Sequence, residues 1–343
     1  MKNKETGKSH GLAGMIILAG LIIITFVYLL RETSVGEIAD VISEANLGFA
    51  AVIFILMFMY ISLEGYNEYL LLKAMGSDIR LKTMIQISFV GYYFSMITPS
   101  STGGQPLQAY YLKKKGQNIS DVSLVLVAFT LVYQAVLLTF CMLMMLLQHK
   151  FLTDGITAVR IALIYGFAVG SALIISLIVI LVSKKTAHRI VVFFINLLSK
   201  LKLVKDKEKS LRNTDEQIDM YESGVKFLFS NPKHLLRMSA IIVLQLCCYF
   251  SIPYFALYSL GIKQYSLYQI IGVQSVLHVS VCSVPIPGSV GANETIFFTL
   301  YAMLVPAQLL LPSLILSRGA GFFVFLLISA AVSLYTHLTS RAV

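Results

Sequence analysis

Two charged side chains stand alone in an otherwise uncharged part of the sequence. Glu294 is the only Asp, Glu, Lys or Arg between Lys263 and Arg318. A lone charge in apolar surroundings is costly, so this acid and the following arginine are expected to pair and to mark a functional site. The alternative is a structural ion pair that pins a hairpin. His278, in the same segment, is expected to be a satisfied polar residue rather than a proton relay.

Prolines and glycines break two apolar segments that could otherwise cross a membrane. The breaks read TPSSTGGQP at residues 98–106 and PIPGSVGANE at residues 285–294. Proline lacks an amide donor, and the pair Gly103–Gly104 permits backbone angles that other residues resist. Unwound backbone at membrane depth is tolerated only where protein or a water-filled cavity satisfies it. Both breaks are therefore candidate binding sites, and the alternative is a turn that binds no ligand.

The polar side chains of the first break suggest what it could bind. Ser100, Ser101, Thr102, Gln105 and Gln108 offer hydrogen bonds, and the start of the next helix favours an anion such as a phosphate. The candidate binding residues of both segments are Thr98, Pro99, Ser100, Gly103, Gly104, Gln105, Pro106, Gln108, Pro285, Pro287, Gly288, Gly291, Glu294 and Arg318.

Two further acids, Glu64 and Glu68, are secondary candidates. They are four residues apart and therefore share one face of a helix. Such a pair could hold a cation or a cationic head group. The alternative is a structural role, because Lys73 follows within reach near the cytoplasmic end of the same predicted span.

The sequence contains few motifs that would indicate an enzyme or a metal site. The sequence has no nucleophile elbow, no phosphate-binding loop ending in Lys-Ser/Thr and no HExxH motif. Its four cysteines lie in apolar stretches without a partner at metal spacing, so they are expected to be buried apolar residues. We therefore expect no metal and no cofactor.

Composition places the chain in a membrane. It has 343 residues, of which 57% are hydrophobic and 13% charged, and its mean hydropathy is +0.80. Apolar runs of about 20 residues predict transmembrane helices. The net charge of +10 resides in the loops between these runs, which argues against a nucleic-acid partner. Tryptophan is absent, so the 18 tyrosines are expected to form the interfacial belt.

The predicted fold is an all-α polytopic membrane protein with six full spans and two broken re-entrant hairpins. The run 11–30 is too long for a signal peptide and is expected to remain as the first span. Lys and Arg place both termini in the cytoplasm, and they place residues 113–115 there too. The spans are predicted at 11–30, 47–72, 120–147, 156–183, 235–260 and 313–338, with hairpins at 83–112 and 266–304.

These segments divide into two units of the same order. Residues 1–150 and 151–343 each contain two spans, a broken hairpin and a third span, and three full crossings invert the second unit relative to the first. Inverted repeats with facing broken helices are typical of secondary transporters. The cytoplasmic loop 184–234 separates two spans of the second unit. Its start, HRIVVFFINLLSKLKLVK, suggests a helix on the anionic inner leaflet, or alternatively a linker packed on the protein.

The motifs TPSSTGGQPLQAYYLKKKG, PIPGSVGANE and SRGAG, in this order, resemble the transmembrane domain of the bacterial lysylphosphatidylglycerol synthase/flippase (MprF) family. The resemblance covers essentially the whole chain and is strongest to stand-alone, flippase-like members from Firmicutes. It departs at Gln105 and Gln108, where many relatives have an acid and an arginine. The second hairpin is therefore the better place for a charged role.

The resemblance implies a lipid transporter in the bacterial cell membrane. Its substrate would be lysyl-phosphatidylglycerol or a related phospholipid, and its activity would protect against cationic antimicrobial peptides. The family's lysyltransferase domain is expected to be absent, because Val343 closely follows the last predicted span. Alternatives are a membrane subunit that works with a separate synthase protein, and a carrier of a polyprenyl-phosphate or glycolipid. A homo-oligomer is also compatible with the sequence.

Overall fold

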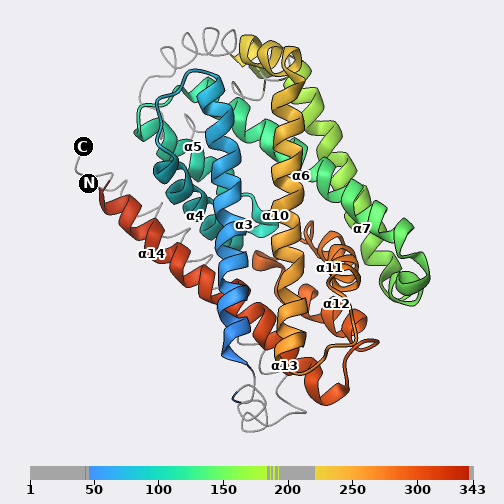
Figure 1. Cartoon of the computed structure of the whole chain (residues 1–343). Helices are drawn as coiled ribbons and strands as arrows, with labels where there is room; N and C mark the ends of the chain where they lie inside the picture. Colours follow the sequence, from blue (N-terminus) through green and yellow to red (C-terminus); the bar gives the residue numbers. More distant parts are fainter. Residues whose placement is uncertain are drawn as a thin grey trace.

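The structure is a computed structural model that describes residues 46–183 and 221–339, together with residues 43, 186, 188, 189 and 192. These parts of the chain are helical and contain no strand, which confirms the predicted class. Within the described residues, five helices are long and apolar enough to cross a membrane. They are α3 (Leu47–Ala74), α6 (Ile119–Leu147), α7 (His149–Val182), α10 (Pro232–Ser259) and the continuous helix 307–339 (Figure 1).

The last of these helices starts earlier than predicted. It begins at Ala307 rather than 313, because Pro312 is accommodated inside its first part, α13 (Ala307–Arg318). A π-helix, η4 (Gly319–Phe323), joins α13 to α14 (Val324–Thr339). The predicted span 11–30 lies outside the described residues, and so does the proposed surface helix at 188–205 except for residues 188, 189 and 192. Residues 221–230, near the end of the same loop, are helical.

Both broken segments form helical hairpins. In the first, α4 (Leu81–Ile97) and α5 (Gly104–Lys114) are joined through the turn η2 (Pro99–Ser101). In the second, α11 (Leu267–Val281) and α12 (Ala292–Tyr301) are joined through η3 (Pro287–Ser289). Each arm is shorter than the roughly 20 residues that a spanning helix needs.

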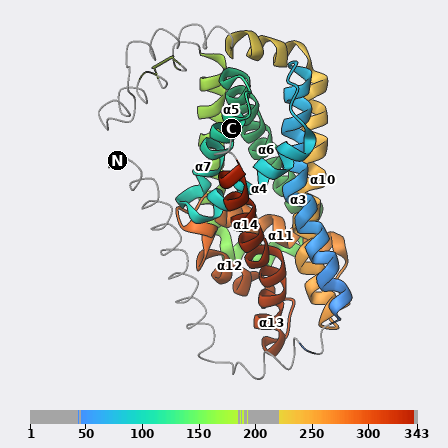
Figure 2. The ribbon, with the colours of Figure 1, turned by 90° about the vertical axis from the view of Figure 1, so that its left-hand side faces the viewer.

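The two hairpins meet tip to tip. In Figure 1, α4 and α5 occupy the upper half of the molecule, whereas α11 and α12 occupy the lower half. Their turns η2 and η3 are in contact. The helices α3 and α10 pack side by side and are adjacent in both views, and α14 packs along α4 (Figure 2). The two breaks therefore lie in the middle of a frame of long helices.

Local sequence signals explain where several helices begin. Asn46 caps α3 by accepting a hydrogen bond from the Gly48 amide at 2.9 Å, and Asn118 caps α6 in the same way. A capping box between Ser266 and Gln269 starts α11. These caps fix the entry point of the second hairpin and of the spans beside both hairpins.

The glycines of the first break allow close packing, and the expectation of unusual backbone angles at Gly103 and Gly104 was wrong. Gly103 has φ −82° and ψ −21°, whereas the positive φ angles belong to Ser100 (51°) and Ser101 (55°). A Cβ on Gly104 would lie 2.7 Å from the carbonyl oxygen of Gly91 on α4. Glycine is needed because the two arms of the hairpin touch backbone to backbone.

We expect Gly104→Ala to separate these arms and to lower the free energy of unfolding by about 1–3 kcal/mol, the usual cost of overpacking. Thermal unfolding of the purified protein measures this loss. Gly319→Ala is the control, because a Cβ there meets nothing within 4 Å. Equal stability of the two variants would contradict the packing role.

The opposed hairpins also predict the sides of the membrane that two exposed residues face. In a background without the native cysteines, Lys114→Cys at the end of α5 should react with an impermeant maleimide from one side only. Gln308→Cys at the start of α13 should react only from the other. Labelling of intact and permeabilised cells measures this, with the cysteine-free protein as the control. Labelling of both positions from the same side would refute the arrangement.

Candidate functional site

A cavity of about 460 Å³ lies where the two breaks meet. Side chains from both hairpins, from the long helices α3, α6, α7 and α10, and from the last span line it. Its polar lining includes Ser95, Ser100, Ser101, Thr102, Gln105, Gln134, Ser283, Ser289 and Asn293, and the charged side chains on its wall are Glu64 and Arg318. A cavity between broken helices is where transporters of this architecture bind their substrates, and this one combines these polar groups with apolar side chains.

The predicted pair of Glu294 and Arg318 is confirmed as an ion pair. Their nearest side-chain atoms, Oε1 and Nη1, are 2.7 Å apart, and the side chains are 7% and 11% exposed, respectively. Glu294 lies in the first turn of α12 and accepts a hydrogen bond from the Gly291 amide, which caps that helix. Because Arg318 ends α13, the pair joins the second hairpin to the last span.

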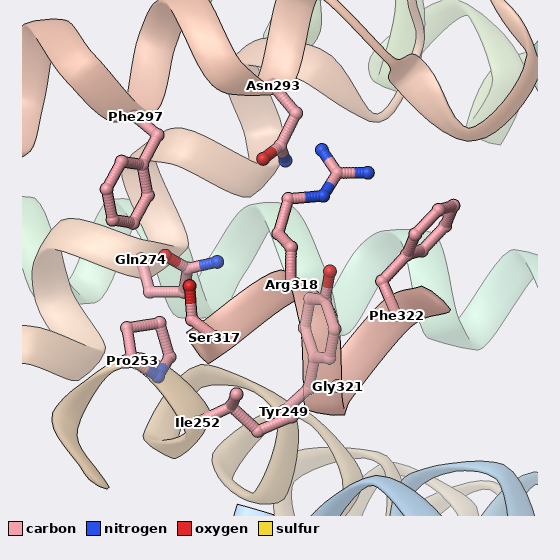
Figure 3. Close-up of a pocket in the computed structure, with 10 residues that line it drawn as sticks. All are labelled: Tyr249, Ile252, Pro253, Gln274, Asn293, Phe297, Ser317, Arg318, Gly321 and Phe322. Atoms are coloured by element: carbon pink, nitrogen blue, oxygen red, sulfur yellow. The ribbon is translucent and has the colours of Figure 1, made fainter. Parts of the chain in front are cut away.

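Arg318 also satisfies unwound backbone and faces the cavity. Its Nη2 donates a hydrogen bond to the carbonyl oxygen of Gly288 in the second break at 3.2 Å. Its guanidinium lies 4.5 Å from the centre of the Phe322 ring, a cation–π distance. Figure 3 shows the side chain extending between Asn293 and Phe322 beside a smaller pocket of about 30 Å³. Arg318 therefore lines both spaces.

The first hairpin is joined to α3 through a carboxylate. Glu64 lines the cavity, and its Oε1 accepts a hydrogen bond from Nε2 of Gln108 on α5 at 2.8 Å. Glu68, one turn further along α3, is 0% exposed, and neither of its carboxylate oxygens has a hydrogen-bond partner in the described part of the chain. Lys73 is exposed and forms no ion pair with it. The structural alternative for the two acids therefore does not operate through an ion pair of Glu68 with Lys73.

Comparison with known proteins identifies the family of the chain. The model described as the lysylphosphatidylglycerol synthase TM region matches residues 13–329, which include both hairpins, Glu294 and Arg318. The chain belongs to this family. A UPF0104 membrane protein from Archaeoglobus fulgidus is 23% identical over 279 residues, covering 79% of this chain and 81% of the relative. Family membership and the five apolar helices together indicate a multi-pass membrane protein.

The predicted site residues of this family member divide into two groups. Those on the cavity wall are Glu64, Ser100, Gln105, His278, Gly288 and Arg318. Those that do not line it are Glu68, Thr98, Pro99, Gly103, Gly104, Pro106, Gln108, Pro285, Pro287, Gly291 and Glu294. Several of the second group build the hairpins. Thr98, for example, donates a hydrogen bond to the Phe94 carbonyl at 2.6 Å and accepts one from the Gly103 amide at 2.8 Å, which closes the first turn.

Sequence reasoning missed four tyrosines on the cavity wall: Tyr60, Tyr92, Tyr133 and Tyr249. The expectation that the tyrosines form an interfacial belt was wrong for these. The hydroxyl oxygens of Tyr60 and Tyr133 are 3.2 Å apart, and the rings of Tyr249 and His278 have centres separated by 5.3 Å. The available signal was position, because Tyr60 and Tyr133 lie near the middle of long apolar helices rather than at their ends.

We expect the ion pair between Glu294 and Arg318 to appear as strong coupling in a double-mutant cycle. Glu294→Gln and Arg318→Gln should each cost about 3–5 kcal/mol, because each strands a buried charge, and the double variant should recover much of that loss. Unfolding free energies of the four proteins measure the coupling.

The exposed pair of Glu222 and Lys226, whose charged atoms are 2.8 Å apart, is the control. A double-mutant cycle with Glu222→Gln and Lys226→Gln should give a coupling energy of about 0.3–0.5 kcal/mol, as is usual for such pairs on helices. Additive losses at Glu294 and Arg318 would refute the energetic pairing.

Proposed function

We propose that the protein moves an anionic or aminoacylated phospholipid, such as lysyl-phosphatidylglycerol, between membrane leaflets. The observation that carries this proposal is the position of Arg318, whose charge faces a polar cavity between two broken hairpins. An arginine in such a site binds a phosphate well, because its planar guanidinium can donate two parallel hydrogen bonds. Membership of the lysylphosphatidylglycerol synthase TM family supports a phospholipid as the ligand.

The arrangement of the cavity suggests how a head group could pass. The turn residues Pro99, Ser100, Ser101 and Thr102 are exposed, and three of them also line the cavity. On α7, Val169 and Leu173 line the same space while 36% and 40% exposed. Hydroxyl groups therefore lead into the cavity beside an apolar surface. A head group would enter along the hydroxyls while the acyl chains stay against α7 and the surrounding lipid.

The opposed hairpins favour a transporter mechanism. We interpret residues 1–150 and 151–343 as inverted repeats, each contributing one broken segment to the site. In transporters built this way, one repeat moves against the other and exposes the central site to each side in turn. Export of an aminoacylated lipid to the outer leaflet would reduce surface negative charge and protect the cell from cationic peptides.

Reconstitution tests the proposed transport directly. Liposomes containing the purified protein and a head-group-labelled fluorescent phosphatidylglycerol should expose the inner-leaflet lipid to dithionite, so that the bleached fraction rises beyond the outer-leaflet share. Arg318→Gln should reduce the rate at least tenfold, because the phosphate loses its partner. Arg160→Gln, at an exposed position on α7, should leave the rate unchanged.

Two results would redirect the proposal. A wild-type rate equal to that of protein-free liposomes, with either fluorescent phosphatidylglycerol or its lysyl derivative, would contradict phospholipid transport. A new aminoacylated lipid in cells that express the protein, formed only together with a separate synthase, would instead support the membrane-subunit alternative.

A further inference from the structure

Glu68 presents an electrostatic problem that the proposed lipid site does not solve. Its side chain is 0% exposed, and both of its carboxylate oxygens lack a hydrogen-bond donor in the described part of the chain. Buried carboxylates in proteins are normally paired, hydrogen-bonded or neutral, because an isolated buried charge is very costly. Something that carries a positive charge must therefore neutralise this group.

The neighbouring groups increase the need for a positive charge. Glu64 lies one helical turn away on the same face of α3, and its hydrogen bond from Gln108 is a neutral one. Two carboxylates this close in a low-dielectric site cannot both ionise without a counter-charge. Gln108 is 1% exposed, and its Oε1 also has no donor among the described residues. Three buried acceptor atoms, two of Glu68 and one of Gln108, thus lack a donor among the described residues, and Glu64 connects the two side chains through its place on α3 and its hydrogen bond from Gln108.

No side chain among residues 46–183 and 221–339 is found to supply this charge. Lys73 on the same helix is exposed, and Asn67 uses its Nδ2 to donate to the Met238 carbonyl of α10 at 3.1 Å. Arg318 forms its ion pair with Glu294. Besides Glu64, the titratable or charged groups that line the cavity in the described structure are Tyr60 on α3, Tyr92 on α4, Tyr133 on α6, Tyr249 on α10, His278 on α11, Cys282 at the end of α11 and Arg318 on α13.

We propose that Glu64, Glu68 and Gln108 form a binding site for a single monovalent cation, carried either as a proton or as Na⁺. Carboxylate and amide oxygens are suitable ligands for a hard cation, and a shared proton would serve the same electrostatic purpose. The site is distinct from Arg318, which binds negative charge.

Its position gives the cation a role in coupling. Glu64 is on the scaffold helix α3 and lines the cavity, whereas Gln108 belongs to the first hairpin. Loss of the cation would leave repelling carboxylates at the joint between these two elements. The hairpin and the cavity wall would therefore respond to the cation, which supplies a means of driving transport by an ion gradient. The site itself does not depend on which lipid is moved.

Thermal unfolding of the purified full chain tests the site without any lipid transport. The midpoint is measured against NaCl, balanced by choline chloride, at pH 5 and at pH 8. If the cation is Na⁺, it should raise the wild-type midpoint by several degrees at pH 8 and less at pH 5, where protons compete. If it is a proton, the midpoint should fall as pH rises and ignore Na⁺, because the folded state then binds more protons than the unfolded state.

Matched variants assign the response to these carboxylates. Glu68→Gln and the double variant Glu64→Gln/Glu68→Gln should lose the response, since the amides need no cation. Asp154→Asn, the same change at an exposed position on α7, should retain it. His278→Gln should also retain it, which separates the carboxylates from the buried histidine.

Three outcomes would overturn the proposal. A wild-type midpoint that responds to neither Na⁺ nor pH would exclude a cation at the site. A response that survives in Glu68→Gln, or one that disappears in His278→Gln alone, would place the cation elsewhere. Because lipid movement is not measured, any of these results would leave the proposed lipid transport standing, and a failure of transport would leave the cation site standing.

Discussion

Two helices are interrupted inside the molecule, and the unwound backbone of these breaks must find hydrogen bonds without relying on bulk water. The structure meets this constraint by bringing the breaks together and satisfying them with their own side chains. Thr98 closes the first turn, and Ser289 Oγ donates to the Val281 carbonyl in the second at 3.0 Å. Arg318 donates to the Gly288 carbonyl. The cavity exists because two short hairpins end there instead of continuing as helices.

Close packing of small residues holds the hairpins in this position. Apolar attraction between helices is weak in lipid, so backbone contact and hydrogen bonds must provide much of the association. A Cβ on Gly104 would collide with α4, and one on Gly166 of α7 would collide with the Val279 carbonyl of α11. On α3, a Cβ at Gly65 would lie 3.0 Å from the Met84 carbonyl oxygen of α4. Each hairpin is thus seated by a glycine that permits backbone contact.

The two sides of the cavity differ in how their charges are neutralised. Arg318 lines the cavity, and its charge is balanced by the carboxylate of Glu294. Among the described residues, Glu64 accepts a hydrogen bond from the neutral amide of Gln108, and neither oxygen of Glu68 has a hydrogen-bond partner. A phosphate therefore suits the Arg318 side, and a cation suits the side of α3. In the proposed mechanism, this asymmetry assigns the lipid head group to one side of the cavity and the cation to the other.

The sequence by itself determined the membrane class, the two breaks and the pairing of Glu294 with Arg318. The length of an apolar run, the presence of helix-breaking residues and the isolation of a charge are properties of the sequence itself. They can be read without knowing which residues pack together. It did not determine the roles of Gly103 and Gly104, the isolation of Glu68 from Lys73 or the tyrosines on the cavity wall. Those depend on which helix faces lie against each other. A glycine needed for close contact, an acid without a partner and a tyrosine turned inward all look ordinary until tertiary packing shows what surrounds them.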